Sequence, residues 1–133
     1  MKIVLDSNVI IAAFAVRGLC AELFEVCLLE HEIILSDHIL QKVRKNLLRK
    51  IHLPPKATDS IISYLRDITE IVDPLEVDDP LSVDKKDRKV LGTAVAANAA
   101  FLVTGDRVLL AIKRFRGLKI ATPRGLWEFL RRL

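Results

Sequence analysis

The segment KIVLDSN at residues 2–8 is the clearest indication of the fold class, because a short apolar run there ends abruptly in polar side chains. Its apolar part contains β-branched residues, which favour a strand, and Asp6 follows directly. The segment FLVTGD at residues 101–106 repeats this arrangement and ends in Asp106. In a parallel α/β sheet the carboxyl ends of the strands meet at one edge, where ligands bind. We therefore expect Asp6 and Asp106 to lie close together.

Strand-like and helix-like segments alternate along the rest of the chain, which predicts an α/β domain with a mostly parallel sheet of four to five strands. The 133 residues are most simply one domain, residues 1–133, because they suffice for a single core. The predicted strands are residues 2–5, 32–35, 71–72, 99–104 and 118–120. The predicted helices are residues 8–14, 19–29, 37–50, 56–70, 87–100 and 107–113, and a last helix after Thr122-Pro123. Residues 73–83, which contain two prolines and several acids, are predicted to form a surface loop.

A third acidic position opens the helix predicted at residues 87–100. Asp87 shares a helical stripe with apolar residues, so its side chain should face the end of the sheet rather than bulk water. Asp84 is spaced like the N-cap of this helix, and Asp106 suits the same role after a glycine turn. Capping alone would explain each of these two acids. Carboxylates gathered at one edge repel one another unless a cation neutralises them, however, and oxygen ligands suit Mg²⁺ or Mn²⁺.

For Asp6 the alternative to a metal ligand is a polar turn. Ser7 or Asn8 would then cap the next helix, which would leave Asp6 itself unexplained at the strand end. We therefore favour the metal site for this residue.

The charges are unevenly distributed, although the net charge is only +4. Residues 67–87 hold eight acids against two lysines, whereas residues 107–132 hold eight bases against one acid. Separated charges of this kind indicate a polyanion-binding surface around an acidic centre, although solvated helix faces would give the same pattern. The candidate polyanion-binding residues are Lys42, Lys45, Arg49, Arg107, Lys113, Arg114 and Arg116.

Several classes of protein are not expected. No apolar run approaches the roughly 18 residues that a membrane span needs, and polar residues interrupt the N-terminal apolar region where a signal peptide would be apolar. A cytoplasmic protein without membrane contact is the expectation. The three scattered histidines and the absence of a Cys-x-x-Cys pair argue against a zinc site.

Four motifs, in this order and spacing, resemble the PIN-domain family. They are LDSNVI at residues 5–10, Ser36 opening a helix after a strand, DRKVLGTA at residues 87–94 and AAFLVTGD at residues 99–106. The resemblance covers essentially the whole chain and is strongest to the toxin components of toxin–antitoxin pairs of the VapC type.

The resemblance implies a three-layer α/β/α fold and a metal-dependent endoribonuclease with Mg²⁺ or Mn²⁺ as cofactor. It also implies an RNA substrate, an antitoxin protein as partner, and a homodimer or higher homo-oligomer. The residues that match the family's functional positions are the metal-binding and catalytic aspartates Asp6, Asp87 and Asp106, the accessory acid Asp84, and the supporting residues Ser7, Asn8 and Thr104.

One position departs from the family's pattern. The family usually has a glutamate in the helix after the second strand, where this chain has Lys42 with Gln41 beside it. A lysine there opposes a metal ion at close range. Asp37, one turn earlier, is a potential substitute, and Val108 stands where the family often has a further acid. The alternative hypothesis is therefore a catalytically impaired PIN domain that binds RNA or an antitoxin without cutting. A phosphohydrolase or receiver-like domain fits less well, because Asn8 stands where a phosphohydrolase needs a second aspartate.

Overall fold

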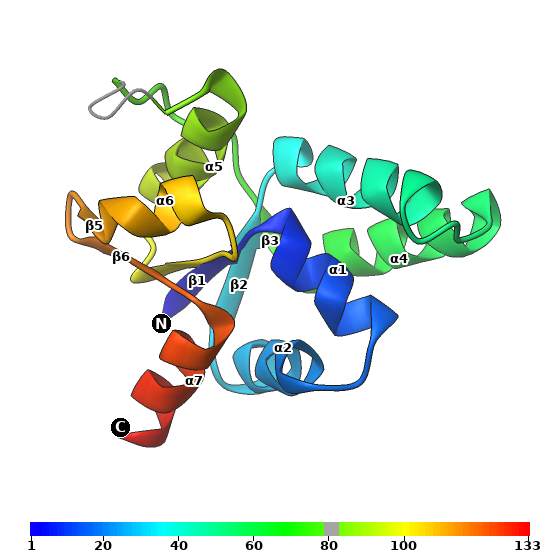
Figure 1. The fold of residues 1–133 in the computed structure, drawn as a ribbon, viewed down its shortest axis with the longest axis horizontal. Coiled ribbons are helices and arrows are strands. Elements are labelled where there is room, and N and C mark those ends of the chain that lie inside the picture. Colours follow the sequence, from blue (N-terminus) through cyan, green and yellow to red (C-terminus); the bar gives the residue numbers. More distant parts are fainter. Residues whose placement is uncertain (79–82) are drawn as a thin grey trace.

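The computed structural model describes residues 1–78 and 83–133, and its elements alternate between strand and helix (Figure 1). Within these residues the elements are, in order, β1 (Lys2–Leu5), α1 (Ser7–Ala15), α2 (Leu19–Glu30), β2 (Glu32–Leu35), α3 (Asp37–Arg49), α4 (Pro55–Ile68), β3 (Glu70–Ile71), α5 (Lys85–Ala96), β4 (Phe101–Val103), α6 (Arg107–Ile112), β5 (Arg114–Phe115), β6 (Leu118–Ala121) and α7 (Pro123–Arg131).

One sheet runs through the molecule with the strand order β3-β2-β1-β4-β6-β5. β1 lies at its centre, where Val4 pairs with Ile34 of β2 and with Leu102 of β4. All neighbouring strands are parallel except β5 and β6. The prediction of a mostly parallel sheet is confirmed, but in the described residues the sheet has six strands rather than four to five.

The strand that the sequence did not predict is β5, which forms a tight hairpin with β6. Arg116 and Gly117 connect the two strands, and both have positive φ angles, 51° and 82°. Two successive positive φ values are the geometry of a two-residue hairpin turn whose twist matches the strands. The usual Asn-Gly or Asp-Gly signal is absent, which is why this hairpin was missed.

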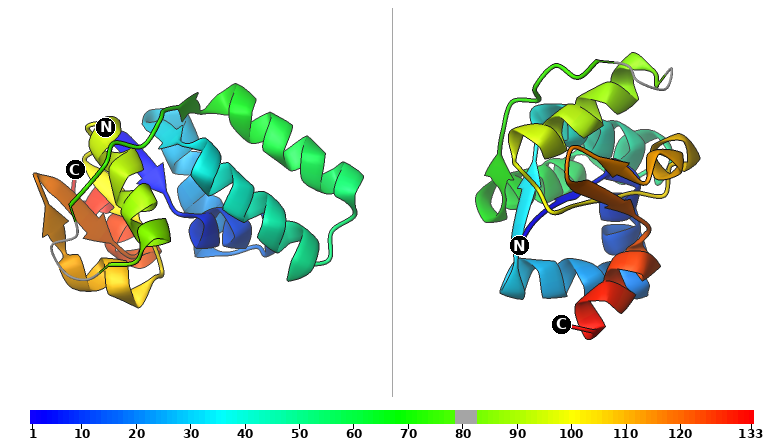
Figure 2. Two further views of the ribbon diagram at one scale, coloured as in Figure 1. Left: turned by 90° about the horizontal axis from the view of Figure 1, so that it is seen from above. Right: turned by 90° about the vertical axis from the view of Figure 1, so that its left-hand side faces the viewer.

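The helices form two layers around the sheet. Figure 2 shows α5 on one face of the sheet, with α2 and α7 on the opposite face. α1 packs on α2 and α3, and α3 packs against α4, so that α3 and α4 lie side by side and extend away from the sheet. This is the expected three-layer α/β/α arrangement.

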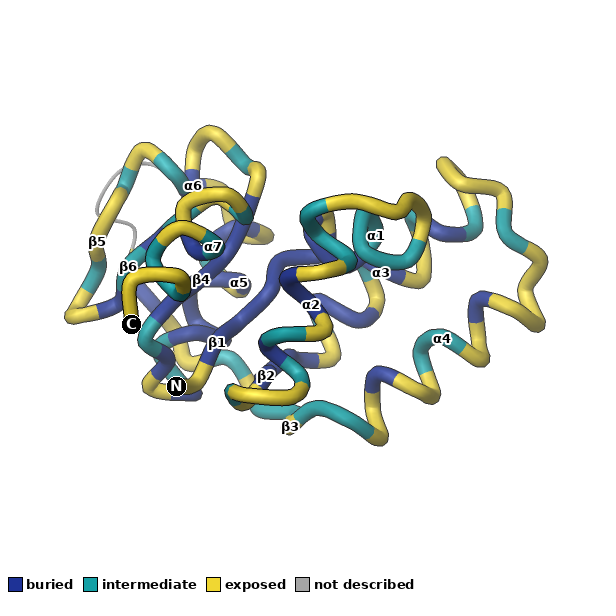
Figure 3. The backbone as a smooth tube through the Cα atoms, turned by 90° about the horizontal axis from the view of Figure 1, so that it is seen from below, coloured by how far each residue is buried: buried dark blue, intermediate teal, exposed yellow. Residues whose placement is uncertain are grey.

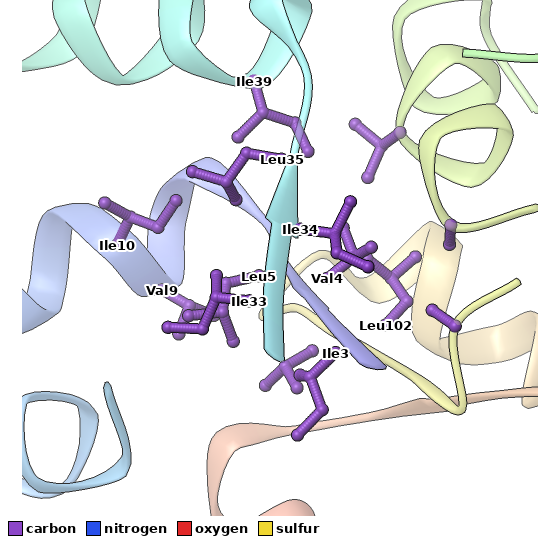
Figure 4. Packing of buried hydrophobic residues seen from close by; sticks show 14 of the residues in the cluster. Ile3, Val4, Leu5, Val9, Ile10, Ile33, Ile34, Leu35, Ile39 and Leu102 are labelled. Atoms are coloured by element: carbon purple, nitrogen blue, oxygen red, sulfur yellow. The ribbon is translucent and has the colours of Figure 1, made fainter. Parts of the chain in front are cut away.

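The core lies on the central strands. Ile3, Val4 and Leu5 of β1 are completely buried, as is Ile34 of β2. Figure 4 shows these side chains packed with residues of α1, α3 and β4, and Figure 3 shows the buried backbone concentrated in the central strands. Parallel strands covered on both faces read as continuous apolar runs, which explains why the strand at Lys2–Leu5 was recognisable.

Element boundaries differ from the predictions mainly around α5. This helix spans Lys85–Ala96 rather than residues 87–100, because Asp84 caps its start and Asn98 adopts a left-handed conformation, φ 52°, after its end. The alanines near residue 100 have high helix propensity, but they lead into β4. Residues 73–78 form neither helix nor strand, as expected, and the rest of the predicted loop, residues 79–82, lies outside the described residues. None of the helices in the described part of the chain is long and apolar enough to cross a membrane.

Candidate functional site

Asp6 is a buried carboxylate at the end of the central strand. It is only 1% exposed. Its Oδ1 accepts a hydrogen bond from the backbone N–H of Ser7 at 2.7 Å, and its Oδ2 accepts one from the Thr104 hydroxyl at 2.7 Å. Asp6 is thus the N-cap of α1, and the alternative in which Ser7 or Asn8 caps this helix does not hold, because both residues lie inside the helix. The capping hydrogen bond from the Ser7 N–H satisfies one oxygen of Asp6. Burial of a carboxylate charge costs free energy unless further hydrogen bonds or a positive charge offset it, so capping alone does not explain why Asp6 is buried.

Hydrogen bonds join the ends of β1 and β4. The Thr104 hydroxyl, which donates to Asp6, also accepts a hydrogen bond from the backbone N–H of Asp106 at 3.0 Å. Asn8 Oδ1 accepts a hydrogen bond from the Gly105 N–H at 3.0 Å. Thr104 is completely buried. These bonds hold Asp6 and the Asp106 turn in a defined relation, so Asn8 and Thr104 lie where residues that support the acids should lie.

The start of α5 brings two more acids to the same edge. α5 runs back along the sheet before β4, so its N-terminus lies near the carboxyl ends of the strands. Asp84 caps the helix by accepting a hydrogen bond from the Asp87 N–H at 2.8 Å. Asp87 is 9% exposed, and its carboxylate accepts no hydrogen bond from the described residues. The structure therefore holds a nearly buried carboxylate without a donor.

The electrostatics of Asp87 show that the acids are neighbours. Burial, followed by the charges of Asp106, Asp84 and Asp6, raises the pKa of Asp87 to about 6. The Lys42 ammonium acts in the opposite direction. The other three predicted acids thus lie within electrostatic range of Asp87, and we call the four residues the acid cluster (Asp6, Asp84, Asp87 and Asp106).

The donors of this cluster suit a hard divalent cation. Carboxylate oxygens are the ligands that Mg²⁺ and Mn²⁺ prefer, and the Asp87 carboxylate accepts no hydrogen bond within the described part of the chain. The carboxylates do not converge fully, since no group of three or more His, Cys, Asp or Glu side chains in the described residues is placed to hold a metal ion. Asp106 is also occupied in part, because its Oδ1 caps α6 by accepting hydrogen bonds from Val108 and Leu109. The chemistry of the donors fits a metal ion, and the side chains would have to draw together around it.

Lys42 reaches the acid cluster, as its position in α3 predicted. Its Nζ lies 3.7 Å from Asp6 Oδ1, and its side chain is 28% exposed. Asp37, the suggested substitute for the missing glutamate, does not: it is exposed and forms an ion pair with Arg66 of α4. The idea that Asp37 replaces the glutamate is therefore wrong. Val108 is 52% exposed on α6 and supplies no acid.

A pocket beside the acid cluster contains residues that the sequence did not single out. His38 lies close enough to Asp6 and Lys42 for both charges to affect it, and its Nε2 is buried without a hydrogen-bond partner in the described residues. Burial, followed by the charges of Lys42 and Lys89, lowers the pKa of His38. The pocket has a volume of about 690 Å³ and is lined by His38, Gln41, Pro74, Leu75, Glu76, Val77, Asp78, Lys85, Arg88 and Lys89. Three bases of this lining, Lys85, Arg88 and Lys89, belong to α5, and two of them are the pair that follows Asp87 in the sequence.

The predicted RNA-binding residues lie in two separate groups. Lys45 and Arg49 are exposed on α3, and Arg107, Lys113, Arg114 and Arg116 are exposed on α6 and the β5–β6 hairpin. Figure 1 shows these segments on opposite sides of β1. Lys42 differs from the others because it points into the acid cluster.

Comparison with known proteins connects this geometry to a family. A family model described as PIN domain matches residues 2–108. Two similar solved structures are VapBC2 from Rickettsia felis bound to a DNA fragment from its promoter and VapBC-1 from nontypeable Haemophilus influenzae. The first has 18% sequence identity and a TM-score of 0.65 over 90% of this chain and 97% of that chain. The second has 17% identity and a TM-score of 0.67 over 93% and 99%. No curated protein sequence matches significantly.

Proposed function

Because this chain belongs to the PIN-domain family, we propose that it is a metal-dependent endoribonuclease and the toxin of a toxin–antitoxin pair. The observation that carries the proposal is the acid cluster at the carboxyl edge of the sheet, in which burial and the neighbouring acids raise the pKa of Asp87 to about 6. An arrangement of negative charges of this kind favours a cation.

Mg²⁺ or Mn²⁺ would be held by Asp87 and Asp106, with Asp6 and Asp84 completing the negative field. When bound, the ion supplies a nucleophilic water of lowered pKa and a positive charge that stabilises the transition state of phosphodiester hydrolysis. The chain's own residues orient the acids. Thr104 fixes Asp6 and the Asp106 backbone, and Asn8 fixes the Gly105 turn.

The exposed bases would hold the RNA backbone. Lys45 and Arg49 on one side of β1, and Arg114 and Arg116 on the other, can contact phosphates without reading the sequence of the RNA. Arg116 also lies over the Phe115 ring at 5.0 Å, which keeps its charge at the tip of the hairpin.

An antitoxin and a second copy of the chain are the protein partners in this proposal, and the fold comparison supports the first. Both similar structures are described as VapBC assemblies, which supports an antitoxin protein as the partner of this chain. Homodimerisation is the second part of the proposal, and sedimentation of the purified chain with and without a candidate antitoxin tests both.

The second candidate function is a PIN domain that binds RNA or an antitoxin without cutting. The ion pair between Lys42 and Asp6 favours it, because a cation already stands at the acid cluster. A protein of this kind would retain RNA affinity while showing no metal-dependent cleavage.

Cleavage of a labelled RNA in Mn²⁺ and in EDTA separates the two functions. A nuclease cuts in Mn²⁺, stops in EDTA, and loses at least about 100-fold in rate in Asp6→Asn, because an acidic ligand or its support is removed. Asp37→Asn is the matched control, since Asp37 lies on the surface and pairs with Arg66.

The outcome that would contradict the nuclease is equally defined. No cleavage by the wild type, with cleavage by Lys42→Glu, would identify a scaffold disabled at this one position. Lys56→Glu carries the same change in charge at an exposed position of α4, outside the proposed RNA-binding residues, and should remain silent.

A further inference from the structure

The acid cluster already has a positive charge beside it, the ammonium group of Lys42. Asp6 is 1% exposed, and it is held by the Ser7 N–H and the Thr104 hydroxyl. Both of these donors are neutral groups. In the described residues Lys42 is the one cationic side chain in ion-pair contact with Asp6, at 3.7 Å from Oδ1. A buried carboxylate needs a counter-charge, and Lys42 supplies it.

The position of Lys42 follows from the packing of α3. Ser36 begins the helix as its N-cap, and the buried side chains Ile39, Val43 and Leu47 fasten α3 to the core. Lys42 is half-buried beside this stripe. Its ammonium group therefore reaches Asp6, at the end of β1. Lys45, on the next turn, is exposed and makes no ion pair within the described part of the chain.

The influence of Lys42 extends beyond one contact. Its charge acts on Asp87 in the opposite direction to the other acids, and it also acts on His38. It therefore offsets part of the negative field that would attract a metal ion. An exposed surface lysine would do this weakly, but the Lys42 side chain is largely shielded from solvent, so its charge is screened less.

We propose that Lys42 is a tethered cation of the acid cluster, which stabilises the metal-free protein and weakens divalent-ion binding by occupying the place beside Asp6. Lys42 is thus a positioning residue, and it raises the concentration of divalent ion that is needed to fill the site. This inference rests on the proposed metal site but makes separate predictions for the metal-free protein and for metal affinity.

Titration of Mn²⁺, followed by calorimetry or by the spin-resonance signal of the free ion, tests whether Lys42 weakens divalent-ion binding. We expect Lys42→Met to bind Mn²⁺ on the order of tenfold more tightly than the wild type, because a repelling unit charge is removed at short range. Lys42→Glu should bind more tightly still, because it adds an oxygen ligand. Lys45→Met and Lys45→Glu are matched controls with the same changes in charge and should shift the affinity by no more than about twofold.

Thermal unfolding in EDTA tests whether Lys42 stabilises the metal-free protein. Lys42→Met should unfold at a lower temperature than the wild type and than Lys45→Met, because Asp6 loses its counter-charge. Lys42→Arg, which keeps the charge, should restore most of the loss. In a double-mutant cycle Asp6→Asn and Lys42→Met should be non-additive, since either change removes the same pair. Circular dichroism verifies that each variant is folded. If Asp6→Asn does not fold, the Lys42 variants alone test the inference.

The results that overturn the inference differ from those that overturn the proposed function. Equal Mn²⁺ affinities in wild type and Lys42→Met, or equal melting temperatures of the two in EDTA, would contradict the role of Lys42 and leave the nuclease intact. Absence of Mn²⁺ binding in every variant, Lys42→Glu included, would overturn both the proposed metal site and the inferred weakening of metal binding.

Discussion

At the scale of single residues, the hydroxyl of Thr104 is the group that connects the two acids at the strand ends. It donates to Asp6 Oδ2 and accepts from the Asp106 backbone N–H. The hydroxyl is completely buried, so water cannot replace either bond. The arrangement of the acids therefore depends on a neutral side chain that carries no chemistry itself.

Thr104→Val tests this connection. We expect it to lower the free energy of unfolding by about 1–3 kcal/mol, because a buried carboxylate loses a donor. Thr58→Val is the matched control: the Thr58 hydroxyl is buried without a hydrogen-bond partner in the described residues, so its removal should change stability by less than about 1 kcal/mol or increase it. Urea unfolding measures both. Equal losses in the two variants would contradict the role of Thr104.

Asp87 predicts how stability depends on pH in the metal-free protein. Its pKa rises from 3.8 to about 6 on folding, so between these values the unfolded chain has released a proton that the folded chain retains. Stability should therefore fall as the pH rises from about 4 to 6, and the cost is complete above pH 6. In EDTA, Asp87→Asn should remove this decline and unfold at higher urea concentration than the wild type at pH 7.

Asp67→Asn is the control for this profile, because Asp67 is exposed on α4. It should follow the wild type at every pH. Parallel profiles for the wild type and Asp87→Asn between pH 4 and 6 would show that burial and the neighbouring acids do not raise the pKa of Asp87.

At the scale of elements, α5 is the helix whose placement decides the site. It carries Asp84 and Asp87, and it packs against the chain segment that precedes it, where Leu75 N–H donates to the Gly92 carbonyl at 3.1 Å. A Cβ at position 92 would lie 2.1 Å from the Leu75 carbonyl oxygen. Glycine is required there by this close approach rather than by its backbone angles.

Gly92→Ala should therefore destabilise the protein by more than about 2 kcal/mol, although alanine alone would favour the helix by about 1 kcal/mol. Gly18→Ala is the control, since a Cβ there meets nothing within 4 Å, and should change stability by less than about 1 kcal/mol. A neutral Gly92→Ala would mean that the Leu75 segment moves away at little cost.

Variants of Asp84, at the start of α5, distinguish a capping role from a metal-binding role. Asp84→Asn keeps an N-cap, so we expect little change in stability, whereas Asp84→Ala should cost about 1 kcal/mol. If the Asp84 carboxylate contributes to the metal site, both variants should bind Mn²⁺ more weakly. Thermal unfolding in EDTA and Mn²⁺ titration measure the two effects independently, and unchanged Mn²⁺ affinity in both would assign Asp84 to capping alone.

At the scale of the whole molecule, the sheet places acids at its carboxyl edge and bases on either side of it. The α6–β5 segment and α3 flank β1, whereas α7 lies away from them at another end of the molecule (Figure 1). RNA that follows the first two segments would pass the acid cluster. The distribution of charge, rather than its total, is what suits a polyanion.

The salt dependence of RNA binding tests this arrangement. In EDTA, the variant with both Lys113→Gln and Arg114→Gln should bind RNA more weakly and reduce the slope of log affinity against log salt by about 1–2, because up to two phosphate contacts are lost. The control with Arg131→Gln and Arg132→Gln removes the same charge on and beside α7 and should keep the slope. Equal slopes in the two double variants would contradict a specific RNA path.

The sequence alone determined the features that depend on neighbours in the chain. The ends of β1 and β4, the caps at Ser36, Asp84 and Asp106, and the inward direction of Asp87 all follow from local periodicity and capping chemistry. The order of parallel strands then brought the acids to one edge. The β5–β6 hairpin could not be predicted, because its turn has Arg116-Gly117 in place of the usual Asn-Gly or Asp-Gly.

Only the tertiary structure decided which partners those residues have. Lys42 and Asp6 are far apart in the chain, and their ion pair depends on how α3 packs against α1, the helix that follows β1. Asp37 is on the same helix, but it faces α4 and pairs with Arg66. A long side chain can reach several neighbours, and helix packing selects one of them. Sequence reasoning could therefore place a lysine near the acids, but only the packing of α3 showed that its ammonium meets Asp6.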